Sequence, residues 1–303
     1  MRAGASLAVV RASGSRGGRD LLIEGTIPPQ GRVRVQINRQ PLRRTRDLLG
    51  AIRVSVFSPD DLVLVKGGPG ERRRYLDDLL VSCHPRWDAL RADVDRILRQ
   101  RATLLKQAGG RLTTEIALTL DVWDDKLATA GTALADGRVE LVADLAPQVA
   151  QAYRDLVAGP SSVALSYAAP WRVDAGGPGL AATLAAARTD DVRRGVSTVG
   201  PHRDDLVVTL DGMPARTHAS QGEQRSLTLA LRLGGHGVVA AAAEDDPILL
   251  LDDVFSELDP ARSAALLAHL PAGQAMLTTA GPLPEGVVPA ATVHVHEGQA
   301  TRA

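Results

Sequence analysis

One short apolar run that ends in two acids constrains the fold of this chain more than any other feature. Residues Ile248–Leu251 are all Ile or Leu, and Asp252 and Asp253 follow directly. The run predicts a buried strand, and ligands of open α/β sheets bind at the carboxyl ends of such strands. Adjacent acids there repel each other, so a cation or a polarised water is expected beside them. We therefore expect Asp252 to help hold Mg²⁺ and Asp253 to orient an attacking water; a strand that ends in a solvated turn is the alternative.

Strands and helices are expected to alternate in the last third of the chain. Leu206–Leu210 predicts a strand that runs into a tight turn at Asp211-Gly212. A helix is expected from about residue 220 and another from Pro260, with a further strand over 275–279. This alternation implies a parallel sheet covered by helices.

The first half of the chain shows two other patterns. Residues 7–57 predict strands joined by turns, partly through period-two alternation. Amphipathic stripes then predict helices from Tyr75 to Leu156. Residues 158–180, rich in Gly, Pro and Ala, predict a strand and a loop that lead back to the sheet.

Two motifs flank the acidic strand, and both have a local explanation. Ser220 and Glu223 have the spacing of a capping box at a helix start, and Gly222 would let a phosphate approach the free N–H groups there. A structural helix cap and a helix start that contacts a phosphate are compatible interpretations of these residues. Asp259 and Pro260 fit an N-cap and the first position of a second helix.

The order of these motifs resembles the second half of an ABC-type ATPase head. By this resemblance Ile248–Asp253 corresponds to the Walker B strand. The signature motif, which contacts nucleotide bound to a partner subunit, corresponds to Ser220, Gln221, Gly222, Glu223 and Gln224. The D-loop corresponds to Ser256, Glu257, Leu258 and Asp259.

Three longer blocks narrow the resemblance to the RecF family. They occur in the family's order at Pro59–Asp77, Gly200–Leu206 and Ser220–Leu227. The resemblance implies an α/β fold, an ABC/SMC-type ATPase head with a mixed sheet and a helical insertion lobe. Residues 1–57 would then be the remainder of the N-terminal part of ATPase lobe I, 58–160 helical lobe II, and 161–303 the C-terminal half of lobe I.

The same resemblance implies a function. RecF proteins act in recombinational repair, replication and the SOS response. The expected cofactors are ATP and Mg²⁺, and the expected assembly is an ATP-dependent homodimer. The expected partners are duplex or gapped DNA, RecO and RecR, with which the protein promotes recombinase loading. The expected location is the cytoplasm, which also suits a chain with a single cysteine, Cys83, and no apolar run long enough to span a bilayer.

The chain departs from the family in its phosphate-binding loop. Such a loop needs G-x-x-x-x-G-K followed by Ser or Thr, and the 303 residues contain no Gly-Lys pair. Gly67-Gly68-Pro69-Gly70 lacks a following lysine, and we expect it to be a turn. We expect a segment to be missing at the N-terminus, through a start codon placed too far downstream rather than a real truncation. The chain alone is then expected to bind ATP poorly and to show no ATPase activity. The alternative is a DNA-binding or dimerisation module without an ATP site.

The charges are unevenly distributed, although the net charge is zero. Residues 1–111 carry 22 Lys and Arg against 11 Asp and Glu, and residues 112–303 carry 13 against 24. This asymmetry suggests a surface for a polyanion; attraction between the two halves is the alternative. Few aromatic residues are present, so arginine–phosphate contacts are favoured over base stacking. The candidate DNA contacts are Arg39, Arg43, Arg44, Arg46, Arg72, Arg73 and Arg74. For the last three, pairing with acids of the second half remains an equal alternative.

Overall fold

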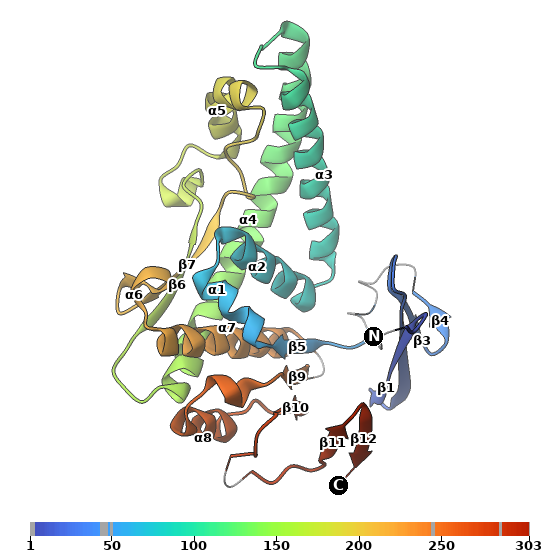
Figure 1. Cartoon of the computed structure of the whole chain (residues 1–303). Helices are drawn as coiled ribbons and strands as arrows, with labels where there is room; N and C mark the ends of the chain where they lie inside the picture. The colour runs from blue at the N-terminus through green and yellow to red at the C-terminus, as the bar shows by residue number, and fades with distance from the viewer. Residues whose placement is uncertain (1–3, 43–47, 49–50, 244–245, 285–286, 303) are drawn as a thin grey trace.

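The computed structural model describes residues 4–42, 48, 51–243, 246–284 and 287–302. A tower of long helices rises from a body of strands and helices, and the first four strands form a separate sheet beside it (Figure 1). The largest group of buried apolar side chains is continuous from the body into the tower.

A three-stranded parallel sheet lies in the body. Strand β9 (Ile248–Leu251) is its centre, between β5 (Val54–Phe57) and β10 (Ala275–Leu277). Leu249 and Leu251 are buried, whereas the other two residues of β9 are partly exposed. The sequence pattern therefore predicts this strand and its parallel pairing correctly, although β10 ends at Leu277, before the expected end at 279.

Helix α7 (Gln221–Ala242) packs on this sheet and on the base of α4 (Thr114–Leu156). The two helices approach closely at Gly234, which has no side chain; a Cβ added there would lie 2.6 Å from a methyl group of Val149. After β9 the chain forms a short turn of 3₁₀-helix, η4 (Val254–Glu257), and then α8 (Pro260–Ala268). Both expected helices of this region are confirmed.

The tower consists of α3 (Arg86–Gln107), α4 and α5 (Leu180–Arg194), with α2 (Pro69–Cys83) at its base (Figure 1). Helices α3 and α5 both contact α4. Helix α5 is an element that the sequence patterns do not predict. The helical tower thus takes α3 and α4 from before residue 161, where the sequence places the start of the last domain, and α5 from after it.

The other strands are antiparallel. Strands β1 (Ala8–Arg16), β2 (Arg19–Ile27), β3 (Arg34–Ile37) and β4 (Gln40–Pro41) form the separate sheet in that order. A third sheet has the order β6 (Val163–Ala168), β7 (Asp205–Leu210) and β8 (Met213–Pro214), followed by the short helix α6 (Ala215–His218). Near the C-terminus β11 (Val293–His296) pairs with β12 (Gln299–Arg302). The combination of a parallel sheet, antiparallel sheets and a helical lobe agrees with the expected α/β fold class.

The region before α2 corrects one expectation. Residues 59–66 form the 3₁₀-helix η2 (Pro59–Leu62) and the short helix α1 (Val63–Lys66). Pro69 and Gly70 are not part of a turn, because they are the first residues of α2, and Gly68 is its N-cap. A proline is well suited to this first helical position, since its missing N–H would have no partner there anyway.

Candidate functional site

The two acids lie where the sequence predicts, at the carboxyl end of the central parallel strand. The Asp252 N–H donates to the carbonyl of Phe57 on one neighbouring strand, at 2.9 Å. The Thr278 N–H, at the end of the other neighbour, donates to the carbonyl of Leu251, also at 2.9 Å. The Asp252 side chain is exposed and that of Asp253 is partly exposed. Both carboxylates are therefore held at the sheet edge where ligands of α/β proteins bind.

Thr278 connects these two residues. Its hydroxyl donates to Asp252 Oδ1 at 2.6 Å and accepts a hydrogen bond from the Asp253 N–H at 3.0 Å. Asp253 adopts a left-handed backbone conformation, with φ 48° and ψ 33°. Such a conformation is uncommon for a residue other than glycine and usually needs support from its surroundings. Sequence analysis does not predict the role of Thr278, because the residue lies 26 positions after Asp252.

The start of α7 has the predicted capping box. The Ser220 hydroxyl accepts from the Glu223 N–H at 3.4 Å, and the Ser220 N–H donates to Glu223 Oε2 at 2.7 Å. These hydrogen bonds lower the pKa of the Glu223 carboxyl. Gln221 is exposed, and a Cβ added to Gly222 would lie 3.0 Å from the Arg262 guanidinium. The exposed helix start leaves N–H groups available to an anion.

Gln224 differs from the other residues of this motif. It is buried, and its amide donates to the backbone carbonyl of Ala219 at 3.0 Å and to that of Arg216 at 3.3 Å. These contacts fix the loop that leads into α7. Gln224 therefore holds the backbone before α7 from the buried side, while Ser220 and Gln221 form the exposed surface of the motif.

The segment after Asp253 is joined to the start of α7. Arg225 forms an ion pair with Glu257 at 2.6 Å, and Ser256 Oγ donates to the carbonyl of Asp253 at 2.8 Å. Leu258 packs against the core, and Asp259 caps α8 by accepting from the Arg262 N–H at 2.9 Å. The structure therefore links the two acids, the segment 256–259 and the capped helix start into one connected surface.

Comparisons with known proteins decide the family. A scan against protein-family models found no match. However, the chain is 46% identical to the DNA replication and repair protein RecF of Kineococcus radiotolerans, in an alignment that covers the whole chain and 84% of that protein. The chain belongs to the RecF family. It is also 45% identical to the RecF protein of Frankia alni, over 92% of the chain and 78% of the relative.

Solved structures agree with this assignment to the RecF family. Two structures of the recombination mediator RecF, one with ATP and one with ATPrS, match 99% of the chain and 81% of their own length. Their TM-scores are 0.86 and 0.83, at 24% and 25% identity. An Smc head bound to a domain of ScpA matches with a TM-score of 0.54 at 15% identity, which shows the fold alone. The fold is thus the predicted ABC/SMC-type head, and ATP binding occurs in the RecF family.

The candidate DNA-binding arginines have different surroundings in this RecF-family chain. Arg39 is exposed at the tip of the β3–β4 hairpin, where it has φ 67°. Arg74 is also exposed and pairs with Glu71 in the same helix. Arg43, Arg44 and Arg46 lie outside the described residues.

Arg72 follows the structural alternative. It is buried, and its guanidinium makes two hydrogen bonds of 2.8 Å to the Asp205 carboxylate and one of 2.9 Å to the carbonyl of Gly67. Asp205 belongs to the acidic second half of the chain, so this ion pair joins the first and second RecF blocks. In this structure the Arg72 side chain is not exposed to a DNA backbone. Arg73 is partly buried and donates to the carbonyl of Asp204 at 2.7 Å.

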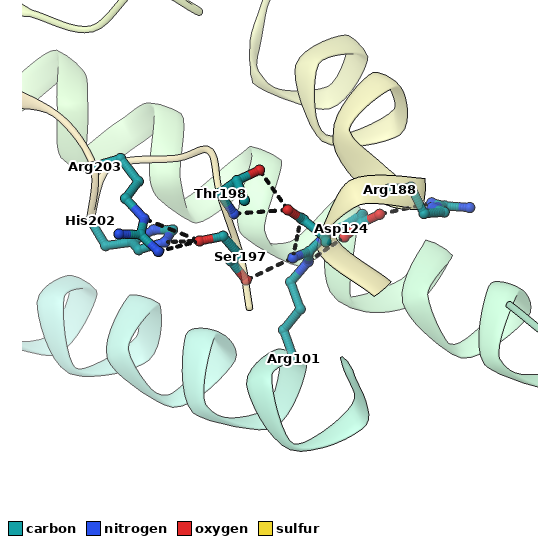
Figure 2. Close-up of polar contacts among 8 residues, drawn as sticks. Arg101, Asp124, Arg188, Ser197, Thr198, His202 and Arg203 are labelled. Atoms are coloured by element: carbon teal, nitrogen blue, oxygen red, sulfur yellow. Dashed lines mark hydrogen bonds and ion pairs between the residues drawn. The ribbon is translucent and has the colours of Figure 1, made fainter. Parts of the chain in front are cut away.

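A buried network stands behind the second RecF block (Figure 2). Arg101 of α3 is fully buried and pairs with Asp124 of α4 and Asp191 of α5, each at 2.7 Å. It also donates to the Ser197 hydroxyl at 2.7 Å. His202 and Arg203 both contact the carbonyl of Ser197, at 3.1 Å and 2.8 Å. The long sequence separation of these partners explains why sequence analysis does not find the network.

Proposed function

We propose that this chain is a RecF-type, ATP-dependent DNA-binding protein of recombinational repair, replication and the SOS response. The observation that carries the proposal is the paired acids Asp252 and Asp253 at the carboxyl end of β9, bridged by Thr278. The ion pair between Arg225 and Glu257 joins them to the capped start of α7. Membership of the RecF family supports the proposal independently.

Each residue of this surface has a proposed role. The Asp252 carboxylate suits a hard cation, so it would hold Mg²⁺, directly or through water. Asp253 would orient the attacking water. The exposed N–H groups at the start of α7 would contact the nucleotide of a second copy. The residues of that signature are Ser220, Gln221, Gly222, Glu223 and Gln224. The segment Ser256, Glu257, Leu258 and Asp259 would act as the D-loop between the two copies.

The proposed partners follow from the family. They are duplex or gapped DNA, RecO and RecR, and the chain would help them to load recombinase at gaps. The proposed location is the cytoplasm, where bacterial chromosomal DNA lies. No helix among the described residues is long and apolar enough to cross a membrane. The three proposed domains remain those of residues 1–57, 58–160 and 161–303, with α5 contributing to the helical lobe.

A second candidate function is a DNA-binding or dimerisation module that does not use ATP. It is favoured by one feature, the absence of any Gly-Lys pair from the 303 residues. The DNA upstream of codon 1 discriminates between the two. An in-frame G-x-x-x-x-G-K followed by Ser or Thr supports the ATP-dependent function, and a stop codon favours the module.

A solution experiment tests both candidates. Sedimentation velocity and fluorescence anisotropy with a labelled gapped duplex would be measured with and without ATP and Mg²⁺. The proteins compared are the chain extended through an upstream in-frame phosphate-binding loop, and its Asp253→Asn and Ser220→Arg variants. The ATP-dependent function predicts dimers and tighter DNA binding with ATP, retained in Asp253→Asn and lost in Ser220→Arg. DNA binding or dimerisation that ignores ATP in all three proteins supports the module. Absence of both DNA binding and dimers under every condition contradicts both candidates.

Turnover is measured separately as released phosphate. The 303-residue chain is expected to release no more phosphate than its Asp253→Asn variant, because it has no residues that fit a phosphate-binding loop. Turnover well above that of Asp253→Asn would show that the chain hydrolyses ATP without such a loop.

A further inference from the structure

A basic pocket lies between the base of the tower and the second RecF block, away from the acids at β9. Its volume is about 310 Å³. Arg73 and Arg74 of α2, Arg91 of α3 and Arg138 of α4 contribute four guanidinium groups to its lining. Three helices thus bring positive charge to one concave site.

Most acids near the pocket are already paired. Asp77 also lines the pocket, but both of its carboxylate oxygens accept from Arg138, at 2.8 and 2.9 Å. Arg91 pairs with Asp78 and Asp88, each at 3.0 Å, and neither acid lines the pocket. The remaining acid of the lining is Asp95, which is exposed. Four arginines therefore face two acids, one of which is neutralised by Arg138.

Arg73 is the arginine whose charge is least compensated. Among the described residues no carboxylate lies within 4.0 Å of its guanidinium, which donates to the backbone carbonyl of Asp204. Burial lowers the pKa of Arg73 and the charge of Arg138 lowers it further, and the opposite effect of Asp205 and Asp204 does not fully offset them. Two partly desolvated cations that face one pocket are stabilised when an anion lies between them.

His202 also lines the pocket but does not add to its charge. Burial lowers the pKa of His202 to about 4, so the ring is neutral at pH 7. Its Nε2 lies 3.1 Å from the Ser197 carbonyl, an acceptor, so Nε2 carries the proton (Figure 2). The positive charge of the pocket therefore comes from its arginines.

We propose that this pocket binds a phosphate group. Guanidinium groups present several N–H donors in a plane, which matches the oxygens of phosphate. The phosphate belongs either to the backbone of DNA, in which case the inference rests on the proposed function, or to a free phosphate compound. Arg73 and Arg91, on different helices, would contact it from two sides.

The first arm of the test uses inorganic pyrophosphate as the probe. Thermal unfolding of the wild-type chain, Arg73→Gln, Arg91→Gln and Arg99→Gln is followed with and without pyrophosphate, at matched ionic strength. Arg99 is the control, because it is an exposed arginine of α3 that does not line the pocket. The expected result is a rise in Tm for the wild type and Arg99→Gln that is lost in Arg73→Gln and reduced in Arg91→Gln. Two pocket variants are used so that the test still holds if one of them fails to fold.

The second arm measures the affinity of the same four proteins for a fluorescein-labelled duplex over a range of salt concentrations. A backbone phosphate in the pocket predicts weaker binding by Arg73→Gln and a salt dependence whose slope falls by about 1, with Arg99→Gln unchanged. A pyrophosphate effect that needs Arg73, together with DNA affinity that does not, assigns the pocket to a free phosphate compound.

Two results overturn the proposal. One is an equal pyrophosphate effect in all four proteins, and the other is no effect in any. The proposed function is judged separately, because it depends on whether the wild type binds DNA and not on Arg73. Pyrophosphate binding through Arg73 without DNA binding by the wild type would support the pocket and contradict the proposed function.

Discussion

A single hydroxyl group holds the two acids of β9 in place. The Thr278 side chain bridges the carboxylate of Asp252 and the backbone N–H of Asp253, so one group fixes a rotamer and supports a left-handed residue at once. The hydroxyl accepts and donates simultaneously, which a methyl group of the same shape does not.

Thr278→Val is expected to destabilise the chain by about 1 kcal/mol, because it leaves the Asp253 N–H without its partner. Thr278→Ser keeps the hydroxyl and is expected to stay close to the wild type. The measurement is the free energy of unfolding from urea denaturation at pH 7. Equal stability of the valine and serine variants would mean that the hydroxyl makes no net contribution.

His202 predicts a pH dependence of stability. Its pKa is about 4 in the folded chain and about 6.5 in the unfolded chain, where the ring is exposed. Between these values the unfolded chain binds a proton that the folded chain does not. The contribution of His202 is therefore fully present above about pH 6.5 and is lost as the pH falls towards 4, with a total on the order of 3 kcal/mol.

The comparison of wild type with His202→Gln tests this, because it removes the titration and leaves the carboxylates unchanged. Urea denaturation at pH 7 and pH 5 is expected to show a smaller loss of stability in the variant. An identical loss in both proteins would assign the acid sensitivity to other groups.

At the scale of elements, the helix starts follow directly from local sequence. The capping box at Ser220 sets the start of α7, and Asp259 with Pro260 sets the start of α8. Because these capping signals involve residues at most three positions apart, the helix starts can be predicted from the sequence alone. The same holds for β9, whose four apolar residues and following acids lie within six positions.

Ser220→Ala is expected to cost about 1 kcal/mol of stability, since it removes the side-chain acceptor at the N-cap. Ser220→Asp restores an acceptor and adds favourable charge at the positive end of the helix, so it is expected to recover most of the loss. Thermal unfolding monitored by circular dichroism compares the three proteins. A Ser220→Asp variant as unstable as Ser220→Ala would contradict the capping role.

Other parts of the site could not be predicted, because their partners are distant in sequence. Thr278 meets Asp252 across a strand pair, and Arg72 meets Asp205 from 133 positions away. The sequence patterns do not predict α5, because this Ala-rich helix has few large apolar residues; its buried residues are Leu180, Leu184, Asp191 and Val192. Periodicity reports the face of an element, whereas ion pairs between elements depend on the completed fold.

At the scale of the whole molecule, Arg101 joins three helices and a loop. It pairs with Asp124 and Asp191 from inside the tower and contacts Ser197, next to the second RecF block. Asp191 also accepts from the Thr198 N–H and hydroxyl, at 2.9 and 2.6 Å. The network therefore couples the outer tower to the loop beneath it (Figure 2).

Arg101→Met is expected to destabilise the chain by about 3–5 kcal/mol, because Asp191 is left as a buried charge without its cation. Arg101→Met combined with Asp191→Asn is expected to recover part of this loss, since the uncompensated charge is gone. Arg99→Gln, two positions away on the exposed side of α3, is the control and should lie within about 0.5 kcal/mol of wild type. Additive losses in the double variant would contradict the pairing.

The chain order of the parallel sheet has a consequence for synthesis on the ribosome. Strand β5 ends at Phe57, but its neighbour β9 begins only at Ile248 and β10 at Ala275. Helices α2, α3 and α4 precede β9 and can form while translation continues, whereas among the described strands the parallel partner of β5 is β9, which emerges much later. A nascent chain released before residue 248 would lack β9 and leave β5 without this partner, so it would be a client of chaperones and proteases.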